Sequence, residues 1–178
     1  MGIEGKIEFK GSQKIGELRR KVVTGGDGYK VEGDFVDSLP YDVKITKEGS
    51  DFEATFKIDD LENLKKSSKL ISQTPDSKNM PTGVFKVGDD IEFKGQFFAL
   101  TPHGQGELTV KNVQNNLKFF REGLIWMKQA AILEDDKEVY IKGDFVHGDI
   151  GADILVDKEF VSGNKIKNYG KAFFDSEG

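Results

Sequence analysis

The chain has 178 residues, the usual size of one domain, and a chain of this length buries roughly two thirds of the surface that its unfolded form exposes. Its net charge of −5 argues against a general nucleic-acid binder, and the absence of Cys excludes a disulfide framework, a thiolate nucleophile and a Cys-based zinc site. No apolar run approaches the roughly 20 residues of a membrane-spanning helix. We therefore predict one domain over residues 1–178, with no nucleic-acid partner and no membrane span.

Apolar and polar residues alternate through the first third of the chain, which predicts strands with one buried face. The alternation begins at Ile7 and Phe9, returns around Gly33, and then runs over residues 41–45 and 52–58. The last two segments are joined by a short connection that contains Gly49, as a tight hairpin requires. This third of the chain predicts a β-meander.

A short helix is predicted over about 60–72, where the hydrophobic period changes. Asp59 with Glu62 resembles a capping box, with Asp in place of Ser or Thr. The apolar stripe of this helix is expected to act as a lid or plug on the sheet, and it consists of Leu61, Leu64, Leu70 and Ile71. The lysines at 65, 66 and 69 are expected to face water.

Strand patterns resume after the helix, with turns expected at residues 102–104 and 115–116. The apolar positions of these strands are Ile91, Phe93 and Phe97; Leu108 and Val110; Leu117 and Phe119; Val139, Ile141 and Phe145; and Ile150, Ala152 and Ile154. Such regular spacing is typical of a sandwich, a barrel or a long curved sheet. We predict a mainly β fold, a strongly curved antiparallel sheet or barrel of about ten or more strands with the short helix packed on or in it.

Two pairs of segments in the sequence are similar to each other. Residues 5–11 resemble 90–95, and residues 29–36 resemble 140–146 with an offset of one residue. Two explanations stay open: strands drawn from one small set of residue types look alike, or a β unit is duplicated. In either case, Gly33 and Gly143 inside these strands predict bulges or bends.

Residue types that support catalysis or metal binding form no familiar constellation. His103 and His147 are the only two His residues, each is expected in a surface turn, and no Ser, base and acid occur at a triad spacing. The paired Asp residues favour turns, and no calcium-loop pattern occurs. The Gly-rich segments 25–28 and 103–106 lead into strands, so they predict hairpin turns and not phosphate cradles. We predict no enzyme, no metal and no cofactor; in an enzyme, carboxylates with His103 or His147 would be the candidates.

Large apolar side chains are concentrated between residues 93 and 127. Adjacent pairs such as Phe97 and Phe98 place a large side chain on both faces of a strand, and a second apolar face must be covered by a helix, a partner or a ligand. Our first hypothesis is a binding module that encloses a small apolar ligand, lipid-like or terpenoid, in a β-walled cavity. The residues expected to line this cavity are Phe93, Phe97, Phe119, Trp126 and Phe145. The alternative is a non-catalytic structural or interaction protein whose second apolar face binds another chain, including a second copy in a homodimer.

Residues 83–113 contain a strand, a Leu-x-Pro step, a Gly-x-Gly turn and an Asn-Val strand end in this order. The matching positions are Gly95, Leu100, Pro102, Gly104, Gly106, Asn112 and Val113. This segment resembles the central part of the takeout and juvenile-hormone-binding-protein family, and residues 160–165 weakly resemble the approach to its last helix. The resemblance implies a curved antiparallel sheet round a long helix, an apolar ligand in a tunnel and an extracellular location; without it we expect a cytoplasmic one. The family's disulfide is absent, because the chain has no Cys.

Overall fold

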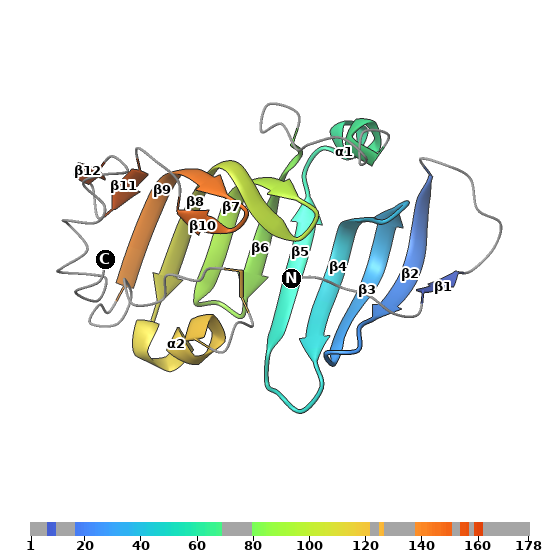
Figure 1. Cartoon of the computed structure of the whole chain (residues 1–178), viewed down its shortest axis with the longest axis horizontal. Helices are drawn as coiled ribbons and strands as arrows, with labels where there is room; N and C mark the ends of the chain where they lie inside the picture. The colour runs from blue at the N-terminus through green and yellow to red at the C-terminus, as the bar shows by residue number, and fades with distance from the viewer. Residues whose placement is uncertain are drawn as a thin grey trace.

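The computed structural model describes residues 7–9, 17–68, 80–121, 125–126, 138–150, 154–156 and 159–161. Strands dominate this part of the chain, and two short helices accompany them (Figure 1). The strands are β1 (Ile7–Phe9), β2 (Leu18–Thr24), β3 (Tyr29–Val36), β4 (Leu39–Lys47), β5 (Glu53–Ile58), β6 (Thr82–Val87), β7 (Ile91–Phe98), β8 (Thr101–Lys111), β9 (Glu138–Val146), β10 (Asp149–Ile150), β11 (Ile154–Val156) and β12 (Glu159–Val161). The helices are α1 (Leu61–Ser68) and α2 (Val113–Arg121).

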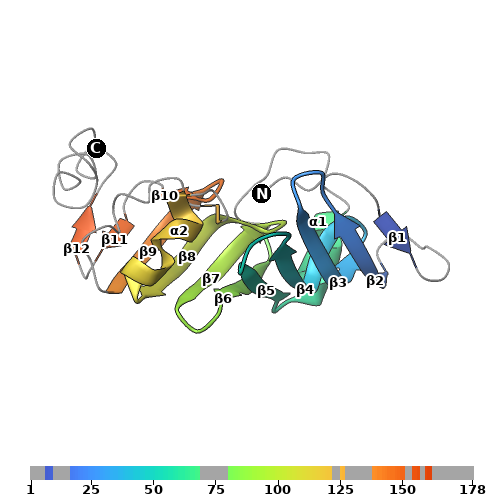
Figure 2. The ribbon, with the colours of Figure 1, turned by 90° about the horizontal axis from the view of Figure 1, so that it is seen from below.

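All of the described strands belong to one antiparallel sheet of 12 strands. From β1 to β9 each strand pairs with the next strand in the sequence, and β9 then pairs with both β10 and β11. The prediction of a mainly β, antiparallel fold is therefore confirmed. The sheet is open, because its pairing runs in one line from β1 to β12, and the two views show strands laid side by side (Figures 1 and 2). The described strands therefore neither close into a barrel nor curl strongly, so the strongly curved sheet or barrel that we predicted is not confirmed.

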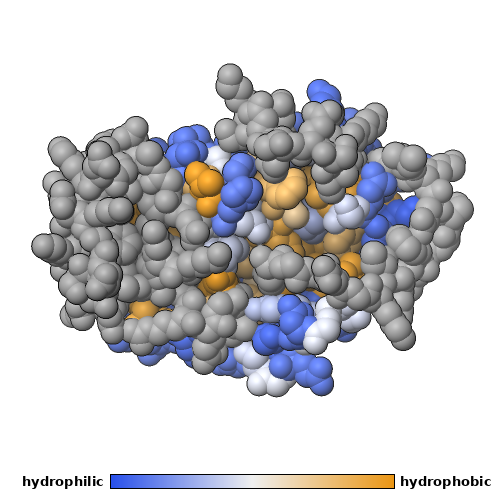
Figure 3. Space-filling model, in the orientation of Figure 1, coloured by the Kyte–Doolittle hydropathy of each residue, from blue (hydrophilic) through white to orange (hydrophobic). Residues whose placement is uncertain are grey.

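One face of the sheet, which we call the inner face, contains the hydrophobic core. Direct strand neighbours such as Val43, Phe56 and Phe85 place their side chains on this face and are buried. The same register continues across β7, β8 and β9, with buried Phe93, Leu108 and Ile141. Figure 3 shows hydrophobic side chains in the middle of the molecule, with hydrophilic ones around them.

The opposite face, the outer face, is predominantly polar. One row crosses seven strands and consists of Glu32, Lys44, Thr55, Lys86, Glu92, Thr109 and Tyr140. Phe97 is fully buried, whereas its neighbour Phe98 is only half-buried. The predicted second apolar face is therefore wrong for the described strands, because alternation along each strand places charged and hydroxyl side chains opposite the core.

A row of glycines crosses four neighbouring strands. Gly83 pairs with Gly95, Gly95 with Gly106, and Gly106 with Gly143. A Cβ atom at position 106 would lie 2.1 Å from Cζ of Phe93, so this glycine leaves the space that the Phe93 ring occupies. The sequence predicts bends at Gly33 and Gly143. The register shifts near Gly33, between Asp34 and Phe35, but β8 and β9 pair without a shift at Gly143; a further shift follows Gly95.

Three hairpins repeat one local structure, and two of them contain the similar segments 29–36 and 140–146. In each, a glycine with positive φ is followed two residues later by a buried Phe, and a positive-φ residue then opens a two-residue turn. The glycines are Gly33, Gly95 and Gly143, the phenylalanines are Phe35, Phe97 and Phe145, and the turn residues are Asp37, Ala99 and His147. We call this the repeated hairpin unit.

The turn predicted at 102–104 is wrong, because those residues lie inside β8.

Helix α1 covers the first part of the helix predicted over 60–72. Its cap is Asp60 and not Asp59, because the backbone N–H of Asn63 donates to Asp60 Oδ1 at 3.0 Å. Leu64 is buried, Leu61 packs against the core, and the helix contacts β3 and β4. Lys66 is exposed as expected, while Lys65 is half-buried and lies near Glu62. Leu70 and Ile71 lie outside the described residues.

Helix α2 replaces the strand predicted around Leu117 and Phe119. The Asn pair at 115–116 suggested a turn, but both residues lie inside the helix. Buried Asn116 donates from Nδ2 to Asp90 Oδ2 at 3.1 Å and to the carbonyl oxygen of Asn112 at 3.1 Å. The bond to Asp90 ties the helix to the β6–β7 turn, and because both bonds satisfy the amide, a polar residue fits the buried side of α2.

Candidate functional site

Four of the five residues predicted to line a ligand cavity lie together on the inner face. Phe93 is central: its ring centroid lies 4.8 Å from that of Phe145, 5.3 Å from that of Phe97 and 5.5 Å from that of Trp126. All three pairs have edge-to-face geometry, the preferred arrangement of packed aromatic rings. Phe56 and Phe85 extend the group through Phe97 and Trp126. Here the rings contact one another, as in a packed core.

The fifth predicted residue, Phe119, belongs to a second aromatic group. Its ring on α2 lies 5.6 Å from that of Phe52, which in turn lies 6.3 Å from Tyr29. Phe52 precedes β5 and Tyr29 begins β3, so this group lies near the end of the sheet where α2 begins. The five residues are thus divided between two sites.

This second group lies at what we call the loop end of the sheet, formed by the β2–β3, β4–β5 and β6–β7 connections and α2, the lower edge in Figure 1. A groove of about 460 Å³ lies here. Its lining consists of Asp51, Glu53, Thr55, Lys86, Val87, Gly88, Asp89, Asp90, Asn116 and Phe119. Four carboxylates and one lysine make this lining acidic. Sequence reasoning treated the Asp pair at 89–90 only as a turn and missed the groove.

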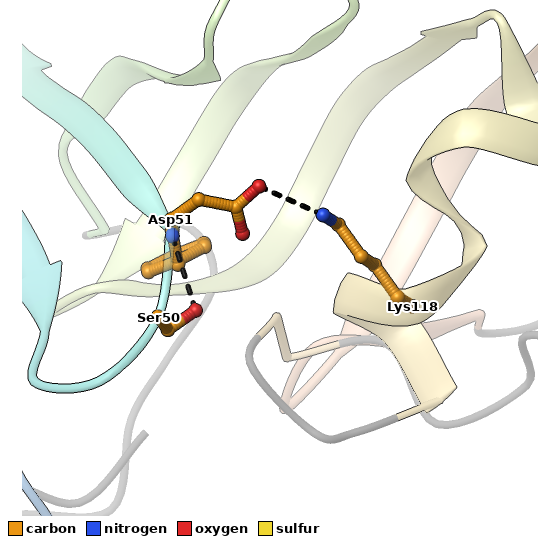
Figure 4. A network of polar contacts seen from close by, with 4 residues as sticks. Ser50, Asp51 and Lys118 are labelled. Carbon is orange, nitrogen blue, oxygen red and sulfur yellow. Dashed lines mark hydrogen bonds and ion pairs between the residues drawn. The ribbon is translucent and has the colours of Figure 1, made fainter.

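An ion pair joins α2 to the β4–β5 connection at this groove (Figure 4). Lys118 Nζ lies 2.8 Å from Asp51 Oδ2 and 5.0 Å from the centroid of the Phe119 ring. The hydrogen bond from Lys118 holds the pKa of Asp51 below its ordinary value of 3.8, so this carboxylate is ionised at neutral pH. Ser50 Oγ accepts the backbone N–H of Phe52 at 3.1 Å and orders the adjacent turn.

A second, smaller groove of about 330 Å³ lies at the same end, between the β2–β3 turn and the end of β4. Lys47 Nζ lies 4.3 Å from the centroid of the Tyr29 ring and donates to the carbonyl oxygen of Asp27 at 2.6 Å. Tyr29 and Lys47 are direct cross-strand partners, which places the lysine over the ring. Each groove is therefore lined by an aromatic ring against which a lysine of the chain lies.

The two histidines, predicted in separate turns, lie beside each other. Their ring centroids are 4.6 Å apart, and the backbone N–H of His147 donates to His103 Nδ1 at 3.2 Å. Burial and the neighbouring His147 lower the pKa of His103 from its ordinary value of 6.5, while Asp144 raises it. The pair connects β8 to the third repeated hairpin unit, and no sequence signal relates two positions so far apart.

Within the described ranges, no group of three or more His, Asp or Glu side chains is suited to a metal ion. Neither α1 nor α2 has the length and hydrophobicity needed to cross a membrane, among the residues that the structure covers.

No protein-family model matches the chain, and no curated protein matches it either. The resemblance of residues 83–113 to the takeout and juvenile-hormone-binding-protein family therefore stays a prediction. In the fold, these residues form β6, β7, β8 and the start of α2.

Proposed function

We propose that this chain is a non-catalytic interaction module, built from repeated hairpin units and used to bind another protein chain. The observation that supports it is the sequence-ordered sheet in which three copies of one hairpin lie in β3–β4, β7–β8 and β9–β10. From β1 to β9 each strand contacts its neighbours in sequence, as the units of repeat proteins do, and the resulting extended surface is the kind that repeat proteins use for binding.

The packing of the aromatic residues also favours an interaction module. A container for a small ligand needs space among its lining side chains, whereas Phe93 is surrounded by the rings of Phe97, Trp126 and Phe145 at packing distances. Burial of such rings stabilises the sheet and makes it a firm support for its surfaces.

The outer face and the loop end are the surfaces that such a module presents. On the outer face, oppositely charged side chains form ion pairs such as Lys86 with Glu92 and Lys142 with Glu107. These side chains are exposed or, for Glu92 and Glu107, half-buried, so the ion pairs stabilise the fold little. The loop end differs, because its two grooves combine aromatic rings with acceptor oxygens. We place the binding site there.

Native mass spectrometry of the chain, freshly purified from its source cells, tests this function. We expect the chain to be retained in a complex with a second protein chain, without a small-molecule adduct. A bare monomer would contradict the proposal, and a monomer with an added small-molecule mass would favour a ligand carrier instead.

A carrier of a small apolar ligand is the second candidate function, and Trp126 is the observation in its favour. Its Nε1 is buried and has no hydrogen-bond acceptor among the described residues. Buried donors are normally paired, so a ligand that combines an apolar body with an acceptor oxygen would satisfy this N–H. The indole packs against Phe85 and Phe93, which would form the apolar part of that site.

A further inference from the structure

Aromatic rings connect the two grooves of the loop end, and they indicate which chemical group a partner would place there. Its two grooves are linked through Phe52, whose ring contacts Tyr29 in the smaller groove and Phe119 in the larger one. A line of three aromatic rings therefore runs along this end of the sheet, with a groove at each end of the line.

An ammonium group of the chain already lies against the ring that lines each groove. Lys118 lies over Phe119 and pairs with Asp51, while Lys47 lies over Tyr29 and donates to a backbone oxygen. An ammonium group is stabilised by the face of an aromatic ring and by a nearby acceptor oxygen, and both grooves supply the two together. The chain's own lysines thus show which chemical group fits these positions.

The contact between Lys118 and Asp51 is open to exchange with a ligand. The Asp51 side chain is 71% exposed and that of Lys118 is 46% exposed, so a partner can reach both. Exposed ion pairs contribute little to stability, and one can be replaced by an equivalent pair with a ligand at small cost. The acidic lining of the larger groove and the chain's net charge of −5 would attract a cation from a distance.

We infer that the loop end binds a basic segment of the partner chain, whose Lys or Arg side chains take the positions of Lys118 and Lys47. This inference rests on the proposed function as an interaction module. Lys118 then acts as an internal competitor, occupying Asp51 and Phe119 until the partner displaces it.

Binding of a fluorescein-labelled oligolysine peptide, measured by fluorescence anisotropy at low salt, tests the inference. Lys118→Met frees Asp51 and the Phe119 ring, so we expect the peptide to bind about two- to fivefold more tightly than to the wild-type chain. Asp51→Asn should weaken binding by a similar factor, because it removes the acceptor charge. An oligoglutamate peptide should not bind either variant.

Two variants on the outer face control for net charge. Lys142→Met and Glu107→Gln change the charge of the chain as the loop-end variants do, but they disrupt an ion pair away from both grooves. We expect each to shift peptide affinity less than its loop-end counterpart. Equal shifts, or no peptide binding to either the wild-type chain or Lys118→Met, would overturn the inference.

The two proposals fail separately. If native mass spectrometry shows a retained protein partner and Asp51→Asn retains it equally well, the interaction function stands and the loop-end site is wrong. If no protein partner is retained by the wild-type chain, the proposed function itself is wrong. Thermal melts of each variant must match the wild type within a few degrees, which the exposure of these side chains leads us to expect.

Discussion

At the scale of single residues, the histidine pair gives the protein a titratable contact. His103 accepts the backbone N–H of His147 at Nδ1, so it is neutral in this arrangement. Protonation at Nδ1 removes the acceptor and places a positive charge beside the second imidazole ring, while Asp144 is the nearby carboxylate that opposes the effect.

We expect this contact to make stability depend on pH. Because the pKa of His103 is lower in the folded state than its ordinary value of 6.5, the unfolded chain takes up the proton first. Stability should therefore begin to fall as the pH drops below 6.5, and the loss is complete once the pH is below the folded-state pKa. Denaturant melts between about pH 7.5 and pH 5.5 measure the slope.

His103→Asn provides the matched variant for this prediction. The Asn side-chain oxygen can accept the same backbone N–H, but it does not titrate in this range. We expect a smaller slope with pH for this variant than for the wild type. Identical slopes would show that His103 does not titrate differently in the folded and unfolded chain.

Single residues also show where sequence reasoning ends. The buried Phe93, Phe97 and Phe145 were predictable as apolar strand positions, because their alternation specifies one face. The contact between His103 and His147 was not predictable, because it depends on how β8 pairs with β9 and on the turn after β9. Non-local register of this kind leaves no short-range signal in the chain.

At the scale of elements, the sequence did not decide whether helix α1 acts as a lid or as part of the core. Leu64 is 2% exposed and belongs to the same core cluster as the strand residues. We expect Leu64→Ala to cost about 2–5 kcal/mol of unfolding free energy, because the cavity remains in a packed core. Denaturant melts check this value, with exposed Lys66→Ala as a control expected within about 0.5 kcal/mol of wild type.

A much smaller effect of Leu64→Ala on stability would indicate that α1 is a lid. A lid that opens freely leaves the sheet folded, so Leu64→Ala would then change the unfolding midpoint little. An unchanged midpoint would therefore contradict the burial of Leu64 in the core.

Helix α2 shows why element type was harder to predict than element position. Leu117 and Phe119 alternate like strand residues, and the preceding Asn pair favours a turn. In the fold, Asp90 satisfies the buried Asn116 side chain from another element, so the helix tolerates this polar residue. The partner that decides the structure is 26 positions away in sequence.

At the scale of the whole molecule, alternation was enough to predict a mainly β antiparallel fold. It did not distinguish an open sheet from a barrel, because closure depends on whether the first and last strands pair and not on the pattern within each strand. The described strands pair in one line, and the repeated hairpin unit recurs along it. The similarity between 29–36 and 140–146 was the sequence signal for this arrangement.

We propose that the chain presents surfaces on a solid aromatic core and does not enclose a ligand. Trp126, the only Trp of the chain, packs against Phe85 and Phe93 in that core, so its emission reports on it directly. We expect blue-shifted emission that fatty acids, retinoids and terpenoids do not change, after correction against free N-acetyltryptophanamide. A saturable shift or quenching by any of these ligands would contradict the account and identify a carrier.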